Sequence, residues 1–212
     1  MKSTTKIVIS VISIAVASLI IISFIKLHAL SETQSNMDAY QKNKIHVKYL
    51  KLYDKIALHI ISGAVPDFDQ YTVNVIIDKD TLIIKKGEQL TRGIVSYSID
   101  LPDLEEMYIS GGAQIDAFTY QFKKLTIYSS GKSFIRVSGD SVNAICNGNS
   151  YAFINSSMAF IELHDSCTVS LKGGSVTGSV SGKSMLQLLF PVVNNGVKVF
   201  NEAKVVRNLS HF

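Results

Sequence analysis

Residues 131–189 read GKSFIRVSGDSVNAICN, GNSYAFINSSMAFIELH, DSCTVSLKGGSVTGSVS and GKSMLQLL when they are divided after every seventeenth residue, and this stretch decides the fold. Each segment opens with a triplet built from residues that favour turns, such as Gly, Asn, Asp and Ser. A looser copy begins at Gly111, 20 residues before the first, so the repeat covers residues 101–188. A fixed period of this kind is typical of a solenoid, whose repeats pack on their neighbours.

Within each copy, small or apolar residues recur at every second position and fall in the same columns from one copy to the next. Alternation with a period of two indicates strands that bury one face. Each copy therefore predicts two short strands separated by a turn, with equivalent strands paired in parallel as a β-helix. One column before the turn contains Leu125, Val142, Ala159 and Val176, and one after it contains Ile115, Ile135, Ala152, Val169 and Leu186.

Two other folds are alternatives to the parallel β-helix. An ordinary β-sandwich with accidental regularity is one alternative, although a sandwich does not need columns at a constant spacing. A left-handed hexapeptide helix is the other, but the six-residue apolar spacing that it needs is absent from the repeat.

The sequence on either side of the repeat is also rich in predicted strands. Between Ile45 and residue 100 the strands lack the 17-residue columns, so we expect irregular first coils or a cap on one end. After Phe190-Pro191 the alternation resumes with Val193, Val197, Val199, Ala203 and Val205, in columns that continue the period. We therefore place a β-helix domain at residues 45–206, followed by a short tail at 207–212.

The amino terminus contains an apolar segment. Residues 7–25 are 19 residues without a charge, preceded by Lys2 and Lys6, and this length can cross a membrane as a helix. Either residues 1–29 are an uncleaved membrane anchor, or they are a signal peptide cut near Ala29. A polar linker at 30–44 follows. The first alternative predicts an inner-membrane protein whose domain faces the periplasm or the cell exterior, and the second predicts a secreted protein.

The charges and cysteines exclude several classes of protein. The net charge is +4, but three lysines precede residue 30 and the rest of the chain is nearly neutral, so we expect no nucleic-acid partner. Cys146 and Cys167 are 21 residues apart, one period plus four, and should occupy different columns. A disulfide needs Cα atoms closer than about 7 Å. We predict two free thiols, with Cys146 inward and Cys167 at a turn.

A resemblance to a known family begins at residues 101–112, which read LPDLEEMYISGG. This pattern, the segments 52–56 and 71–75, and the Ser-Gly step at 130–131 resemble the putative auto-transporter adhesin head GIN domain, a bacterial family of unknown function. The resemblance covers residues 45–206, with Asp165 and Cys167 replacing the usual Gly and Ser of one turn. It implies an all-β fold, a single-stranded right-handed parallel β-helix that is exported or envelope-attached, and it supplies no catalytic residues.

Motifs for chemistry are weak in this chain. The two Gly-Lys-Ser triplets lack the earlier Gly of a phosphate-binding loop, because Thr126 and Thr177 stand there, so we expect no nucleotide. The histidines show no zinc-ligand spacing. Glu162, His164 and Asp165 straddle a turn and are either a solvated turn or a weak ion or general-base cluster. We predict no catalytic residue, cofactor site or metal site.

Aromatic residues on the outward columns are the candidates for binding. Tyr108 and Tyr128 share one column, whereas Tyr151, Phe153 and Phe160 are expected at adjacent outward positions, with His164 at a nearby turn. Exposed rings on a flat sheet can stack on sugars or contact another protein. They can equally form a ladder that stabilises the sheet.

These observations favour an exported, membrane-tethered bacterial envelope protein with a non-catalytic role in binding, adhesion or scaffolding. Its partners would be the membrane, through residues 7–25, and a glycan or an envelope protein. The alternative is a carbohydrate-active β-helix enzyme, a polysaccharide hydrolase or lyase, which would need acids stacked in a groove.

Overall fold

The structure is a computed structural model that describes residues 18–25, 27–28, 31, 35, 46–69, 71–87, 93–189 and 191–208. Residues 18–25 are helical, and no helix among the described residues is long and apolar enough to span a membrane. Most of the expected anchor at 7–25, the cleavage site near Ala29, nearly all of the linker and residues 209–212 of the tail lie outside the described residues.

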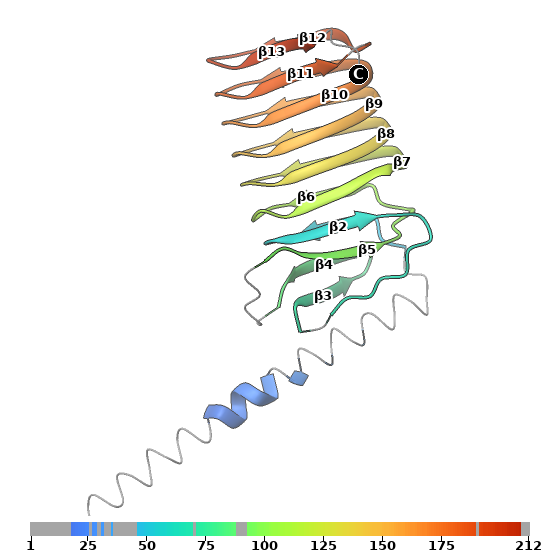
Figure 1. Ribbon diagram of the computed structural model, residues 1–212, viewed down its shortest axis with the longest axis vertical. Coiled ribbons are helices and arrows are strands. Elements are labelled where there is room, and N and C mark those ends of the chain that lie inside the picture. The colour runs from blue at the N-terminus through green and yellow to red at the C-terminus, as the bar shows by residue number, and fades with distance from the viewer. Residues whose placement is uncertain are drawn as a thin grey trace, which may run out of the picture.

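The repeat forms the predicted parallel β-solenoid (Figure 1). Its long strands are β7 (Gln114–Ser129), β8 (Phe134–Cys146), β9 (Tyr151–Leu163) and β10 (Thr168–Val180). Each pairs in parallel with the next, so that Val142 lies opposite Leu125 in β7 and opposite Ala159 in β9. The predicted columns are therefore confirmed, and their apolar members line a continuous buried core.

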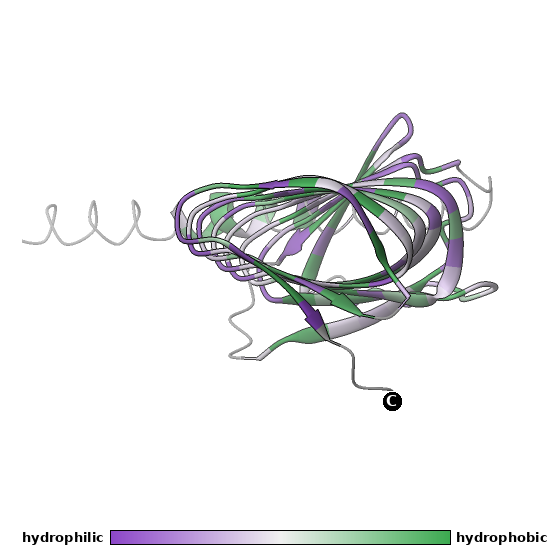
Figure 2. Cartoon of the chain, turned by 90° about the horizontal axis from the view of Figure 1, so that it is seen from above, coloured by the Kyte–Doolittle hydropathy of each residue, from purple (hydrophilic) through white to green (hydrophobic). Residues whose placement is uncertain are grey.

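Each long strand supplies two sides of a coil because it turns a corner near its middle. In β8 the buried positions are first odd, at Ile135 and Val137, and then even, at Val142 and Ala144. This change of phase keeps both halves of the strand facing the interior, although the chain changes direction between them. Seen along the stack, the coils superimpose as a flattened oval (Figure 2).

The turns of successive coils stack as a second ladder. The first residue of every triplet has a left-handed backbone, with φ of 73° at Gly131, 77° at Gly148, 63° at Asp165 and 69° at Gly182. Adjacent turns are bonded, because the Asn149 amide donates to the Gly131 carbonyl at 2.8 Å. The Gly-Lys-Ser triplets are therefore turns, as predicted. Asp165 replaces Gly because Asp tolerates this conformation and its carboxylate accepts the Gly148 amide at 2.9 Å.

The first strands in the sequence do not form the first layer of the solenoid. β1 (Tyr49–Leu52) lies between β4 (Thr81–Lys86) and β6 (Glu106–Ile109), and β2 (Ile56–Ile60) lies between β5 (Val95–Ile99) and β7. β3 (Val73–Asp78) pairs antiparallel with β4 and closes that end of the sheet. An irregular coil and a cap are therefore both present. The 17-residue columns fail here because the layers are not in chain order.

The far end of the solenoid departs from the expected columns. β11 (Met185–Leu189) and β12 (Val193–Val199) both pair with β10 and form the next layer, and β13 (Lys204–Asn208) pairs with β11 as the outermost strand. The ladder shifts register between Val176 and Gly178, so Val193 lies opposite Ser175 and outside the apolar column. Val193 is consequently 55% exposed. Val197 and Val205 pack against the core as predicted.

Both cysteines are free and buried. Cys146 points inward, and this burial raises the pKa of its thiol to about 12. Cys167 lies at the end of its turn, where its Sγ contacts the Gly148 carbonyl at 3.4 Å. The prediction of two free thiols is confirmed.

Candidate functional site

The outward aromatic residues are divided between two faces by the corner in each strand. We call the strand segments before the corner, together with β2 and β5, the first face, and those after it, together with β1 and β6, the second face. Tyr151 and Phe153 lie on the first face, whereas Tyr108, Tyr128 and Phe160 lie on the second. The expectation that Tyr151, Phe153 and Phe160 are adjacent is wrong, because the corner of β9 lies between Phe153 and Phe160, where the buried positions change from even to odd numbers.

On the second face, Tyr108 and Tyr128 stack on each other. They lie directly opposite across β6 and β7, and their rings are nearly parallel, at 10°, with centroids 4.7 Å apart. Lys51, opposite Tyr108 in β1, places its Nζ 5.9 Å from the centre of the Tyr108 ring. The Tyr108 hydroxyl donates to Glu106 Oε2 at 3.0 Å. Burial and then this carboxylate raise the pKa of Tyr108.

A depression with a volume of about 400 Å³ opens beside this pair. β1 and the residue after it supply three of its lining side chains, Tyr49, Lys51 and Tyr53, because alternate residues of a strand point to the same face. Thr81 and Tyr108 complete the lining. We call Tyr49, Lys51, Tyr53, Tyr108 and Tyr128 the tyrosine site.

A larger cleft of about 750 Å³ lies next to the tyrosine site on the same face. One wall is the segment 102–106, which crosses the β1–β2 layer on its way from β5 to β6. The other wall is built by residues 120–124, where three extra residues in the Gly111 coil shift the ladder between Ala117 and Gln121. We call this the charged cleft, and it is lined by His46, Lys48, Asp103, Glu105, Glu106, Tyr120, Lys123 and Lys124, among others.

The acids of the charged cleft all have partners. Asp103 contacts His46, and Glu105 forms an ion pair with Lys48 at 3.2 Å. The hydrogen bond and charge of Glu105 raise the pKa of Lys48. Glu106 accepts the Tyr108 hydroxyl, so it joins the cleft to the tyrosine site.

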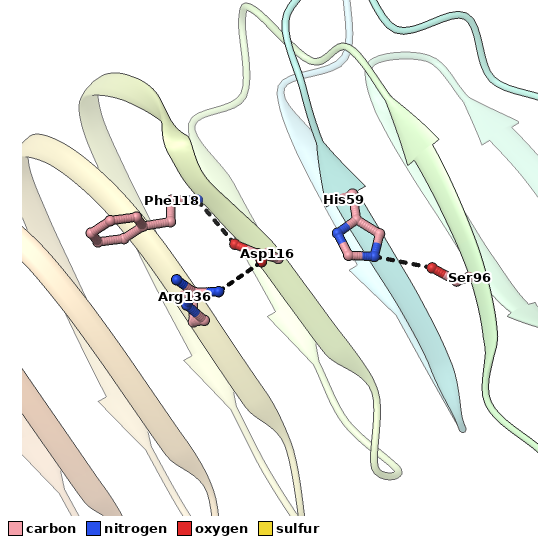
Figure 3. Close-up of polar contacts among 5 residues, drawn as sticks. All are labelled: His59, Ser96, Asp116, Phe118 and Arg136. Atoms are coloured by element: carbon pink, nitrogen blue, oxygen red, sulfur yellow. Dashed lines mark hydrogen bonds and ion pairs between the residues drawn. The ribbon is translucent and has the colours of Figure 1, made fainter.

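The first face carries a different cluster of rings. Phe134 and Tyr151 stack at 5.5 Å and 7° and are 37% and 38% exposed, and Phe153 meets the edge of Phe118 at 5.4 Å. Arg136 lies 5.2 Å from the Phe118 ring and pairs with Asp116 at 3.0 Å (Figure 3). The charged groups of this cluster contact each other and the rings, as expected of a ladder that stabilises the sheet.

His59 lies on the same first face, and its Nε2 is 3.0 Å from Ser96 Oγ (Figure 3). It is half-buried. This contact joins β2 to β5, and we assign it a structural role.

The structure keeps the remaining candidate residues apart. His164 Nδ1 contacts Ser181 Oγ at 3.0 Å, and Asp165 bonds the Gly148 amide, so both serve the turn ladder. No group of three or more His, Cys, Asp or Glu suited to a metal ion occurs among the described residues. Phe160 is 41% exposed in the column of Thr126 and Asn143.

Three residues of the tyrosine site escaped sequence reasoning. Tyr49, Lys51 and Tyr53 alternate in the run YLKLY, which already predicts a common outward face. Their place beside Tyr108 follows only from the pairing of β1 with β6, and no period in the sequence reports that pairing.

The comparisons with known proteins find a likeness in structure but none in sequence. The chain matches no protein-family model and no curated protein. It is similar to the crystal structure of a putative adhesin from Parabacteroides merdae, with a TM-score of 0.40 and 16% identity, over 76% of this chain and 92% of that chain. The resemblance to the head GIN domain therefore stays a prediction from the sequence.

Proposed function

We propose that this chain is an exported, membrane-tethered envelope protein that binds a glycan on the tyrosine site without chemical conversion. The observation that carries the proposal is the stacked pair Tyr108–Tyr128 beside a depression lined by Tyr49, Lys51 and Tyr53. Aromatic rings with a polar tip suit ligands that have one apolar and one hydroxylated side, which is the character of a sugar ring. Hydroxyl and ammonium groups around the rings provide hydrogen bonds that orient such a ligand.

Export and tethering are proposed from the amino terminus. Residues 7–25 are long enough for a membrane helix, and Lys2 and Lys6 orient the amino terminus to the cytoplasm. Fractionation of cells that express the full chain tests this part. We expect the protein in the membrane fraction with its first residues retained, and recovery of a soluble form that begins near residue 30 would contradict tethering.

We also propose that the coil is right-handed and that the domain is of the head GIN type. A crossover between two parallel strands of one sheet is right-handed in nearly all proteins. The run LPDLEEMYISGG at 101–112 supports the family resemblance.

A binding measurement on the full chain in detergent micelles tests the proposed function. We expect at least one member of a panel of soluble bacterial and plant polysaccharides to bind, and Tyr108→Ala to weaken that binding at least tenfold. Tyr151→Ala is the matched control, because Tyr151 also stacks on a ring but lies on the first face. Equal losses from the two variants would contradict the tyrosine site, and so would an unaffected Tyr108→Ala.

A carbohydrate-active enzyme is the second candidate, because the charged cleft gathers Asp103, Glu105 and Glu106. The outward columns did not predict this grouping. Each carboxylate already contacts His46, Lys48 or Tyr108, which leaves none in the isolated state of a general acid. Release of shorter or unsaturated sugars from any bound polysaccharide would favour the enzyme over the binding protein.

A further inference from the structure

The tyrosine site and the charged cleft adjoin along the strands of the second face. Tyr49 lines the depression, and Glu106, directly opposite it in the next strand, lines the cleft. From Lys48 to Tyr53 the strand advances about 17 Å, at about 3.3 Å per residue. We call the depression and the cleft together the groove, and its length fits several linked units of a chain-like ligand better than a single small molecule.

The charges in this groove are not balanced by their own contacts. Of its three acids, Asp103 is held by His46, Glu105 by Lys48, and Glu106 accepts the Tyr108 hydroxyl. Three lysines line the groove without an acidic partner among the residues that the structure describes: Lys51, Lys123 and Lys124. Lys51 stands inside the tyrosine site, and the other two stand on the wall built by the three extra residues.

The three unpaired ammonium groups would meet a ligand that lies along the groove. An ammonium group near a surface favours an anion within about 4–6 Å, and this preference weakens with salt. A neutral glycan would leave all three without a counter-charge. A glycan with acidic groups would satisfy them while its sugar faces contact the rings.

We propose that the groove binds an anionic polysaccharide, whose carboxylate or phosphate groups are held by Lys51, Lys123 and Lys124 while its sugar rings stack in the tyrosine site. This inference rests on the proposed function and adds to it the charge class of the ligand and the residues that read that charge.

The test compares acidic polymers with neutral partners of the same backbone. Full chain in detergent micelles is titrated with polygalacturonate, alginate and hyaluronate, and with the methyl ester of each, in which the carboxylates carry no charge. Poly(glycerol phosphate) is the phosphate arm and distinguishes the two sources of negative charge. We expect at least one acidic polymer to bind tenfold or more tightly than its neutral counterpart, with a preference that falls as salt is raised.

Variants test separately whether the lysines hold the negative charges and whether Tyr108 contacts the sugar. Replacing the three lysines together by Gln should abolish the preference for the acidic form, so that each acidic polymer binds no more tightly than its methyl ester. Lys172→Gln is the control, since Lys172 is an exposed lysine on β10 outside the groove. Tyr108→Ala should weaken both forms.

Four results would overturn the inference. Equal binding of the acidic and esterified polymers would refute the charge class and leave glycan binding intact. A preference that survives the triple variant would refute the assigned lysines. Single-stranded DNA binding as tightly as the best acidic glycan would show a general polyanion surface. Binding of no polymer in the panel would overturn this inference together with the proposed function.

Discussion

Leu50 lies directly opposite Met107 across the parallel strands β1 and β6, although all of β2, β3, β4 and β5 separates the two residues in the sequence. Both side chains are completely buried. On its other edge β1 pairs with β4, where Leu50 lies opposite Leu82. The first strand of the domain therefore lies between the cap and the repeat. Its outward side is part of the second face and carries Tyr49, Lys51 and Tyr53.

This relationship predicts a large loss of stability on truncating Leu50. Leu50→Ala removes a fully buried side chain between two layers and should lower the free energy of unfolding by about 2–5 kcal/mol. Val193→Ala, at a position that is 55% exposed, is the control and should change it by about 0.5 kcal/mol or less. Urea unfolding followed by circular dichroism measures both. Similar small effects would mean that β1 does not occupy the centre of the stack.

The corner of β10 predicts that alanine is tolerated at one glycine of the chain and not at another. Gly173 has a φ of 122°, and a Cβ there would lie 2.1 Å from the Ser156 carbonyl oxygen, whereas a Cβ at Gly93 meets nothing within 4 Å. Gly173→Ala should therefore cost about 2–4 kcal/mol because it combines backbone strain with a backbone clash. Gly93→Ala should be nearly neutral. Thermal unfolding of the two variants measures both effects. A Gly173→Ala variant as stable as the wild type would contradict the close stacking of the corners.

Cys146 predicts a loss of stability in alkali. Burial raises the pKa of its thiol to about 12, above the ordinary value of 9.0. Between these pH values the unfolded chain releases the proton and the folded chain keeps it, so stability is full below about pH 9 and falls as the pH rises. One group contributes a slope of about 1.4 kcal/mol per pH unit.

The measurement compares the wild type with Cys146→Ala by urea unfolding from pH 7 to pH 10.5. The variant loses a buried group at every pH, but its curve should fall less steeply above pH 9. Parallel curves at alkaline pH would show that the Cys146 thiol titrates alike in the folded and unfolded chains.

Residue patterns predict the repeat well because its information is local. The turn at Gly148 and the column of Val142 and Ala159 are each legible within one or two copies, and the structure confirms both. Proximity in sequence equals proximity in the stack there, since each coil packs on the coil that follows it.

The place of β1 and the grouping of the outward aromatic residues could not be predicted, because they depend on contacts that the period does not report. β1 enters the stack out of chain order, so Lys51 and Tyr108 become neighbours without any repeat that links them. The corner likewise bends each long strand between its two halves, and this bend places Tyr151 and Phe160 on different faces. Tyr108 and Tyr128 were predicted correctly as neighbours because they belong to adjacent copies of the repeat.

The crossing segment 102–106 links the groove to β1, and this link predicts an effect of Glu105 on binding. Glu105 and Glu106 donate their backbone amides to the Lys48 carbonyl at 2.9 and 3.0 Å, and Lys48 Nζ pairs with Glu105. Since this ion pair is exposed, Glu105→Gln should change the free energy of unfolding by less than about 1 kcal/mol. It should nevertheless strengthen binding of an acidic glycan by about twofold to fivefold, because it frees Lys48 from its ion pair. A loss of affinity would show that Glu105 itself contacts the ligand.

Contact between sugar and tyrosine rings is the most direct test of glycan binding at this site. Saturation-transfer NMR, with the aromatic protons of the full chain saturated, should transfer signal to the C–H protons of the best-binding polysaccharide. The double variant Tyr108→Ala, Tyr128→Ala should remove most of that transfer, and Tyr151→Ala should leave it unchanged. Undiminished transfer in the double variant, or its disappearance in Tyr151→Ala, would contradict a glycan site on the second face.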